Sequence, residues 1–355
     1  MRLLVVTNDY PPKPGGIQMY LKNLVEAYPD AVHVVAPHDP DAAQQEPGVS
    51  RGSAAYMLPT RTTARTIAAA AEDFEPDAVL FGAPHPLLFL GNVLRRGFDV
   101  PIGVLSHGAE ITIPGALPGV RQLLRRDLAS ADVRFAVSRY TARSVQRISG
   151  SPVEFLGAGV DIETFRLPAV PPANDPPVVG CVSRFVPRKG QDRLIEAAAR
   201  LERDVELLFV GKGRTERELR RKAENLGVRT RFEVDVPWSK LPGLYQQMDV
   251  FCMPTRSRWA GLEVEGLGLV FLEAAASGVP VLVGDSGGAP ETVLPGETGF
   301  VVSDVDSIRE GLEILLDDPV EARQMGHRGR RLVETEFTWA RVVERLYEGF
   351  APFLG

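Results

Sequence analysis

The stretch VVGCVSRFVPRKGQD, residues 178–192, holds the pattern that decides the fold. An uninterrupted apolar run, 178–182, ends at a polar turn that contains Arg184, Arg188, Lys189 and Gly190, and a helical pattern follows. A buried strand that leads through a turn into a helix is typical of a parallel sheet with helices on both faces. Cations at the end of such a strand suit a diphosphate. The charges alone leave a solvated basic loop as an equal alternative.

The same alternation of short apolar runs and helical patterns extends along the whole chain. Strands are predicted over 3–6, 32–36, 78–81, 102–105, 134–137 and 153–156, and again over 178–182, 206–210, 231–234, 250–253, 279–283 and 299–302. Helices are predicted over 17–27, 63–74, 86–95, 120–129, 139–147, 192–201, 215–226, 240–248, 270–277, 320–336 and 339–350. The sequence therefore predicts two successive α/β domains.

A proline-rich stretch divides the two halves and reads as an interdomain linker, because proline disrupts helices and central strands. We expect a first Rossmann-like domain over 1–168, a linker over 169–177, a second Rossmann-like domain over 178–337 and a final helical segment over 338–355. Open parallel sheets bind ligands at the carboxyl ends of their strands. Two such domains facing each other predict one deep interdomain cleft.

The bulk properties indicate a soluble, two-domain protein. The chain has 355 residues, 44% of them hydrophobic, and a formal net charge of −6. No basic domain of the kind that binds nucleic acid is indicated. The first apolar run is too short for a signal peptide, and no run approaches the roughly 18 residues of a spanning helix. We expect a cytoplasmic protein with, at most, peripheral membrane contact; its oligomeric state is left open.

The segment EGLGLVFLE places two carboxylates, Glu265 and Glu273, on either side of a glycine-containing turn and the start of a helix. The backbone N–H groups of Gly268, Leu269 and Val270 would point at whatever lies before that helix. Glu273 could accept hydrogen bonds from a ribose diol, and Glu265 could hold a sugar hydroxyl. The structural alternative is a pair of carboxylates stabilised by the helix dipole.

Two segments of the first half are further candidates. In NDYPPKPGGIQ, residues 8–18, the Gly15-Gly16 pair allows close backbone approach to a phosphate. In SHGAE, His107 directly follows a predicted strand, where it could bond a sugar hydroxyl or stabilise positive charge; His85 is a weaker candidate. A plain turn and a structural histidine are the alternatives. No metal site and no required cofactor are predicted.

Together these elements resemble a known family. The GGI turn, the HG-x-E segment, the S-R-x-x-x-R-K-G turn and the E-x7-E element are similar to the GT-B-fold retaining glycosyltransferases of family 4. More narrowly, NDYPPKPGGIQ, SRFVPRKGQD and GLEVEGLGLVFLEA followed by SGGAPETV resemble bacterial phosphatidylinositol mannosyltransferases that use GDP-mannose. The resemblance implies mannose transfer from GDP-mannose to an inositol lipid, with an α-mannosyl linkage. It also implies that the last helix crosses back onto the first domain.

The resemblance also implies roles for individual residues. Arg184 and Lys189 would bind the donor diphosphate, Glu273 the ribose and Glu265 the mannose. The implied donor site comprises Gly16, Arg184, Lys189, Val236, Glu265, Gly268, Leu269, Val270 and Glu273. The implied acceptor site comprises Asp9, Gln18 and His107. The implied catalytic residues are His107, Arg184, Lys189 and Glu265.

One motif departs from the family pattern. Relatives often carry HG-H-E where this chain has His107-Gly108-Ala109-Glu110, which leaves the acceptor less well defined. Three alternatives stay open: another donor such as UDP-glucose or UDP-N-acetylglucosamine, a non-lipid acceptor, and a non-catalytic protein that binds sugar nucleotides. A Rossmann dehydrogenase is disfavoured because no GxGxxG with a following acidic residue is found.

Basic residues of the first half suggest an anionic surface as partner. Arg139, Arg143 and Arg147 recur at four-residue spacing and therefore share one helix face. Arg121 lies in a second cluster with Arg125 and Arg126. Anionic lipid attracts such groups by roughly 1 kcal/mol per charge near the membrane. Charge alone equally allows solvated helix faces; the family resemblance favours contact with the cytoplasmic face of the membrane.

Overall fold

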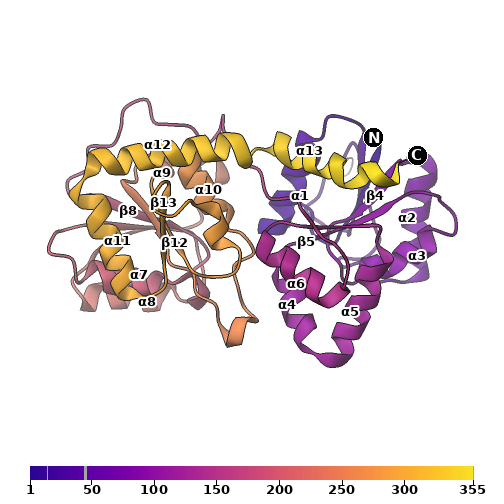
Figure 1. The fold of residues 1–355 in the computed structure, drawn as a ribbon, viewed down its shortest axis with the longest axis horizontal. Coiled ribbons are helices and arrows are strands. Elements are labelled where there is room, and N and C mark those ends of the chain that lie inside the picture. The colour runs from indigo at the N-terminus through magenta and orange to yellow at the C-terminus, as the bar shows by residue number, and fades with distance from the viewer. Residues whose placement is uncertain (14, 44–45, 355) are drawn as a thin grey trace. The chain divides into compact units, whose positions relative to one another are not determined.

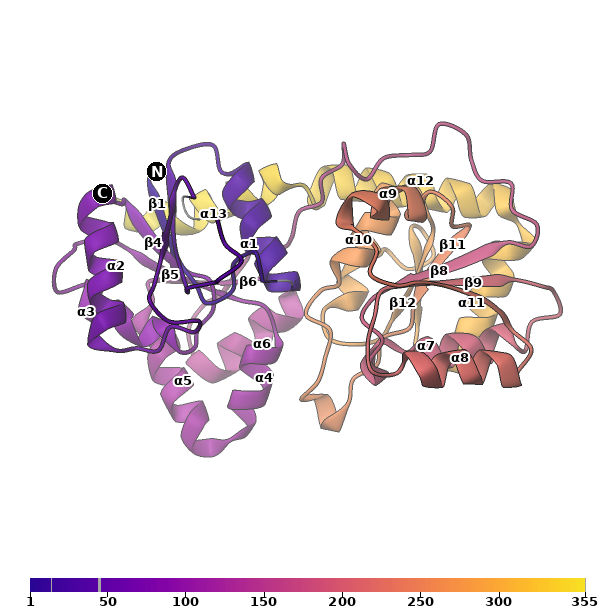
Figure 2. The ribbon, with the colours of Figure 1, turned by 180° about the vertical axis from the view of Figure 1, so that it is seen from behind.

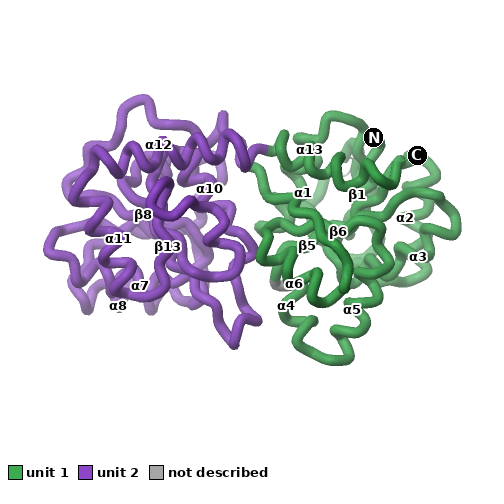
Figure 3. Tube along the Cα trace, viewed as in Figure 1, with its two compact units in different colours: residues 1–159, 339–355 green, residues 160–338 purple. Residues whose placement is uncertain are grey.

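The computed structural model describes residues 1–13, 15–43 and 46–354, with only the backbone of Ala109. The chain forms two compact units: unit 1 comprises residues 1–159 and 339–355, and unit 2 comprises residues 160–338 (Figure 3). Each unit contains one sheet in which every described strand pair is parallel. The predicted α/β class with two Rossmann-like halves is confirmed.

The sheet of unit 1 has the strand order β3-β2-β1-β4-β5-β6-β7 (Figures 1 and 2). Its strands are β1 (Leu3–Val6), β2 (Val32–Ala36), β3 (Val49–Arg51), β4 (Ala78–Phe81), β5 (Ile102–Ser106), β6 (Val133–Ala136) and β7 (Glu154–Phe155). Its helices are α1 (Gly16–Ala27), α2 (Arg61–Phe74), α3 (Gly91–Leu94), α4 (Ala109–Ala116), α5 (Pro118–Ser130), α6 (Arg139–Ser149) and α13 (Trp339–Phe350), with 3-10 turns η1 (Leu87–Leu90) and η6 (Ala351–Phe353).

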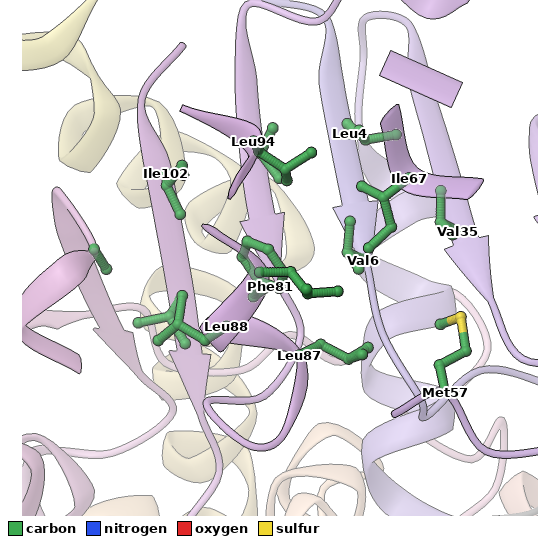
Figure 4. Close-up of a cluster of buried hydrophobic side chains, with 14 of the residues drawn as sticks. Leu4, Val6, Val35, Met57, Ile67, Phe81, Leu87, Leu88, Leu94 and Ile102 are labelled. Carbon is green, nitrogen blue, oxygen red and sulfur yellow. The ribbon is translucent and has the colours of Figure 1, made fainter. Parts of the chain in front are cut away.

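Helices cover both faces of this sheet, which is why its strands β1 and β4 are apolar at every position. Leu4 and Val6 of β1 point into a core that α2, η1, α3 and α5 complete (Figure 4). On α13, the apolar side chains recur at helical spacing and are buried: Trp339, Val342, Val343, Leu346 and Phe350. The ring of Phe350 packs against Phe135 of β6, with centroids 5.5 Å apart. The last helix is thereby part of unit 1.

Unit 2 repeats the architecture with the strand order β10-β9-β8-β11-β12-β13. Its strands are β8 (Val178–Val182), β9 (Glu206–Val210), β10 (Arg229–Glu233), β11 (Val250–Met253), β12 (Val281–Gly284) and β13 (Gly299–Val302). Its α-helices are α7 (Gln191–Ala198), α8 (Glu216–Asn225), α9 (Leu241–Tyr245), α10 (Leu269–Ala276), α11 (Val305–Asp317) and α12 (Pro319–Glu336). Its 3-10 turns are η2 (Pro187–Lys189), η3 (Trp238–Lys240), η4 (Trp259–Gly261) and η5 (Ala289–Thr292).

Several elements differ from those predicted. The helix predicted over 86–95 is the short turn η1 followed by the short helix α3. Helices α4 and α11 and the edge strand β3 were not predicted. In α4, Pro114 lies inside the helix, so the sequence there argues against the conformation that the chain adopts. Packing against α5 and α6 stabilises α4 in its place.

Candidate active site

Three charged side chains of unit 2 converge from the segments that follow strands β8 and β11. The carboxylate oxygen Oε2 of Glu265 accepts hydrogen bonds from Lys189 Nζ at 2.6 Å and from Arg188 Nη1 at 2.5 Å. All three side chains are close to 90% buried. We call these residues the Glu265 cluster. Arg188 also lies 3.8 Å from Glu263, so Lys189 and Arg188 face two carboxylates in all, and Lys189 is the cation that contacts Glu265 alone among the ion pairs of the described residues.

Burial and charge act on the cluster in opposite directions. Burial alone would raise the pKa of Glu265, but Lys189 and Arg188 outweigh it and bring that pKa down to about 2. Burial is the largest effect on Lys189 and lowers the pKa of its ammonium, against the attraction of Glu265. Glu265 is therefore ionised throughout the physiological range.

Two glycines allow the backbone to bring these side chains together. Gly190, which follows Lys189, has φ 77°, and a Cβ there would lie 2.0 Å from the carbonyl oxygen of Pro254. Gly287 has φ 61°, and a Cβ there would lie 2.0 Å from the carbonyl oxygen of Glu265. The loop after β12 also holds Glu265 directly, because Ser286 Oγ accepts from its backbone N–H at 3.2 Å. Any side chain at either glycine would displace the cluster.

The second glutamate of the E-x7-E element lies on α10, one turn into the helix. Oε2 of Glu273 accepts a hydrogen bond from the hydroxyl of Tyr245 at 2.7 Å. Burial raises the pKa of Glu273 to about 7, and the bond from Tyr245 opposes this rise. At the start of the same helix, the N–H groups of Leu269 and Val270 have no hydrogen-bond acceptor among the described residues. These donors are available to an anion or a hydroxyl oxygen.

Arg184 and Val236 lie at the carboxyl edge of the sheet of unit 2. Arg184 lies two residues after the end of β8 and is exposed. Within the described part of the chain its guanidinium has no hydrogen-bond or ion-pair partner. Val236 lines a hollow of about 330 Å³ together with Val182, Ser183, Gly211 and Lys212. This hollow opens where β8 and β9 end, the edge at which parallel sheets bind ligands.

In unit 1, the turn after β1 is joined to α1 by a side-chain hydrogen bond. Gln18 Nε2 donates to Asp9 Oδ1 at 2.7 Å. Burial raises the pKa of Asp9, while the nearby charge of Lys13 opposes the rise. Gly16 begins α1, and a Cβ added there would meet no atom within 4 Å. Space for close approach is thus present beside Asp9 and Gln18.

His107 follows β5 in the same unit and is fixed on two sides. Its Nε2 lies 3.0 Å from the carbonyl oxygen of Gly82, and its ring packs edge-on against Tyr20 at a centroid distance of 5.3 Å. Its backbone N–H and that of Gly108 both donate to Glu110. Burial lowers the pKa of His107, against the attraction of Glu110. The imidazole is therefore neutral at pH 7, with its ring orientation set by Gly82 and Tyr20.

The six arginines predicted to meet a membrane are all exposed and lie on α5 and α6 of unit 1. Among the residues of these two helices, the one acidic side chain is Asp127, which is buried 3.2 Å from His85. Exposed apolar side chains lie beside the arginines: Ile113, Leu117 and Leu123 are each about half exposed. Both ribbon views show α4 and α5 as a hairpin at the edge of the unit (Figures 1 and 2).

Each unit thus brings part of the predicted site together. Unit 1 gathers Asp9, Gln18 and His107, and unit 2 gathers Lys189 with Glu265. Sequence reasoning counted Arg188 among the turn cations suited to a diphosphate, and gave no role to Ser286, Tyr245 or Tyr20. Arg188 lies within a quoted motif, but nothing in the spacing says that it shares an oxygen of Glu265 with Lys189. The tyrosines lie in ordinary helical patterns and carry no signal of their own.

Two properties concern the chain as a whole. Over the described residues, no cluster of three or more His, Cys, Asp or Glu side chains is suited to holding a metal ion. The same residues include no helix with the length and apolarity needed to cross a membrane. Independence from metal stays a prediction.

Family models and curated relatives match nearly the whole chain. The model described as glycosyltransferase family 4 matches residues 14–164, and the model described as glycosyl transferases group 1 matches residues 164–332. A GDP-mannose-dependent monoacylated alpha-(1-6)-phosphatidylinositol monomannoside mannosyltransferase of Corynebacterium glutamicum is 40% identical over 97% of this chain and 96% of its own. A GDP-mannose-dependent alpha-(1-6)-phosphatidylinositol monomannoside mannosyltransferase of Mycolicibacterium smegmatis is 41% identical over 98% and 97%.

Solved structures agree on the fold. Sucrose-phosphate synthase from Thermosynechococcus elongatus superposes with a TM-score of 0.79 at 22% identity, over 99% of each chain. Anabaena HepE, in complex with UDP, superposes with a TM-score of 0.82 at 19% identity, over 99% of this chain and 100% of its own. These likenesses confirm the predicted fold, and the curated relatives establish that the chain belongs to glycosyltransferase family 4.

Proposed function

We propose that this glycosyltransferase transfers mannose from GDP-mannose to a phosphatidylinositol mannoside, forming an α-mannosyl linkage. The observation that carries the proposal is the Glu265 cluster, a buried carboxylate with two cations beside the open N-terminus of α10. Relatives at 40% and 41% identity, which are named as GDP-mannose-dependent mannosyltransferases of phosphatidylinositol monomannoside, support the choice of donor and acceptor.

Unit 2 holds the donor in this proposal. Arg184 and Lys189 neutralise the diphosphate. Val236 seats the base at the hollow where β8 and β9 end. Glu273 accepts hydrogen bonds from the ribose hydroxyls. Glu265 accepts from a hydroxyl of mannose, since its carboxylate is ionised and acceptor-only. The N–H groups at the start of α10 complete the cradle.

The reaction retains configuration, because an α-linked sugar in GDP-mannose becomes an α-linked sugar in the product. The bond between the sugar C1 and the phosphate oxygen breaks, and its electron pair leaves with GDP. The acceptor hydroxyl attacks C1 from the same face, and its proton passes to the departing phosphate oxygen. Arg184 and Lys189 stabilise the charge that grows on the diphosphate, which is the main catalytic effect expected of such preorganised cations. No metal or cofactor is required in this scheme.

Unit 1 serves the acceptor. His107 is neutral and held in one orientation. It is therefore suited to form a hydrogen bond with the reacting sugar, and not to place a positive charge beside it. Asp9 and Gln18 form a ready hydrogen-bonded pair of polar groups for inositol or mannose hydroxyls, and Gly16 leaves room for the donor phosphates.

The six exposed arginines of α5 and α6, which we call the arginine face, bring the enzyme to anionic lipid at the cytoplasmic side of the membrane. Six exposed arginines stand there on a chain whose net charge is −6, and the acidic residue of these two helices, Asp127, is buried. Leu117 and Leu123, beside Arg121, supply apolar side chains that can enter the lipid interface. Arg139 also stacks on Phe155, at 4.7 Å, and so is held in the arginine face.

A transfer assay tests the proposed reaction. The enzyme is incubated with GDP-mannose and phosphatidylinositol monomannoside, and the lipid product is analysed by mass and by linkage. We expect the gain of one hexose in an α linkage, and no comparable product when UDP-glucose replaces GDP-mannose. Preference for the uridine donor, or no hexose on the lipid, would contradict the proposal.

Vesicle flotation tests the membrane face. We expect binding to vesicles with anionic phospholipid, loss of binding in neutral vesicles, and weaker binding when Arg121 and Arg125 are both replaced by glutamate. Replacement of the exposed Arg217 and Arg221 of α8 in unit 2 by glutamate is the charge-matched control. Equal binding to neutral and anionic vesicles would contradict the assignment of these arginines to anionic lipid.

A further inference from the structure

We propose that Tyr245 is a positioning residue for the donor: its hydroxyl fixes the carboxylate of Glu273 so that the remaining oxygen meets the ribose diol. This rests on the proposed function, in which Glu273 accepts from the ribose. Neither the E-x7-E motif nor its spacing points to Tyr245, which lies 28 residues before Glu273 in the chain.

The geometry joins two helices at one carboxylate. Tyr245 is the last residue of α9 and is fully buried, whereas the side chain of Glu273 on α10 is partly exposed. The phenol donates to Oε2 of Glu273 at 2.7 Å. Among the described residues no donor reaches the other oxygen, Oε1. One half of the carboxylate is thus held from the protein interior, and the other half stays available.

Aromatic packing prevents the phenol from turning away. The ring of Tyr245 meets Phe165 edge-on at a centroid distance of 5.7 Å and Phe251 at 5.8 Å. Phe251 belongs to the central strand β11, and its own ring meets Phe271 of α10 at 5.8 Å. The direction of the hydroxyl is therefore set by the core of unit 2, which transmits that order to Glu273.

The chemistry of the pair suits a diol. A carboxylate offers about four lone-pair sites, so one phenol leaves enough acceptors for two ribose hydroxyls. Burial disfavours the ionised form of a carboxyl group, and a donor hydrogen bond offsets part of this effect. Tyr245 therefore both orients Glu273 and favours the acceptor-only state that hydroxyl donors need.

A thermodynamic cycle separates this role from simple packing. The dissociation constants of GDP and of 2′,3′-dideoxy-GDP are measured by calorimetry for the wild type, Tyr245→Phe, Glu273→Gln and the control Phe165→Leu. The control loosens the ring contact of Tyr245 but leaves its hydroxyl in place. Thermal melting of each variant reports on folding.

We expect the wild type to bind GDP at least tenfold more tightly than the dideoxy compound, and Glu273→Gln to lose this preference. Tyr245→Phe should weaken GDP binding about tenfold, the scale of one hydrogen bond to a charged group, and change dideoxy-GDP binding by less than about twofold. Phe165→Leu should affect both ligands equally.

The outcomes distinguish this inference from the proposed function. A wild type that binds neither compound would overturn the donor assignment itself. A ribose preference that is lost in Glu273→Gln but kept in full by Tyr245→Phe would overturn the role of Tyr245 alone. Equal weakening of both ligands in Tyr245→Phe would reduce that residue to a packing role and also overturn the inference.

Discussion

Replacement of Lys189 by alanine separates catalysis from stability within the Glu265 cluster. In the wild type, Lys189 Nζ and Arg188 Nη1 both donate to Oε2 of Glu265, at 2.6 and 2.5 Å. When Lys189 is removed, Arg188 still pairs the carboxylate, so no buried charge is left alone. We therefore expect Lys189→Ala to fold.

The magnitudes of the two effects differ. Loss of one charge-assisted hydrogen bond lowers the free energy of unfolding by about 1.5–3 kcal/mol. This is less than the roughly 3–5 kcal/mol expected when a buried ion loses its only partner. In the reaction, loss of the cation that stabilises the leaving diphosphate raises the barrier by about 3 kcal/mol, so kcat falls about a hundredfold.

Arg188→Ala is the matched control, because it removes the other cation from the same carboxylate oxygen, together with a longer contact of 3.8 Å to Glu263. We expect a similar loss of stability, measured by denaturant unfolding, but a much smaller loss of kcat for mannose transfer. Near-normal turnover in Lys189→Ala, or equal loss of turnover in both variants, would refute the assignment of Lys189 to the diphosphate.

Three further outcomes are expected. Glu265→Gln should lower mannose transfer by at least about tenfold, yet leave GDP binding by calorimetry unchanged or tighter, because Lys189 loses its competing carboxylate; a large loss of GDP affinity would contradict this. Gly287→Ala should lower the free energy of unfolding by about 1–3 kcal/mol, since φ is 61° and the new Cβ would lie 2.0 Å from the Glu265 carbonyl; unchanged stability would show that the loop can move. The preference for GDP over its dideoxy analogue should rise from pH 6 to 8, because Glu273, with a pKa of about 7, ionises in this range. This pH dependence should vanish in Glu273→Gln. A flat profile in the wild type would count against an ionised Glu273 as the acceptor of the ribose hydroxyls.

The ionisation of Glu273 also affects folding, and its contribution to stability falls as the pH rises, whereas the ligand preference rises. The pKa of Glu273 is raised on folding, from its ordinary value of 4.5 to about 7, so the folded state holds its proton where the unfolded state has lost it. This residue therefore favours folding most below pH 4.5, and its contribution falls as the pH rises to about 7. Ligand-free protein should show this trend, and GDP should reduce it.

Most of the fold could be predicted from the sequence because its signals are local. Continuous apolar runs such as 3–6 and 178–182 are strands with both faces buried, and the predicted limits of both match the structure. Helix α11 carries a local signal of its own, because Asp304 and Ser307 form a capping box ahead of an apolar stripe. Helix α4 had no such signal, since Pro114 opposes it and packing decides.

The site could be predicted only where a motif fixes the chemistry. The family resemblance implied that Lys189 and Glu265 belong to one function, but not that they bond directly in the absence of a donor. The bond from Tyr245 to Glu273 joins separate helices, and sequence periodicity carries no information on such a contact. Tertiary partners of this kind follow from the three-dimensional packing of the unit.

A crystal structure of the protein with GDP tests the central claim most directly. We predict that the β-phosphate lies within hydrogen-bonding distance of Lys189 Nζ and of the Arg184 guanidinium, with the ribose hydroxyls at Glu273. Nucleotide bound elsewhere, with these two cations turned away from it, would contradict the claim.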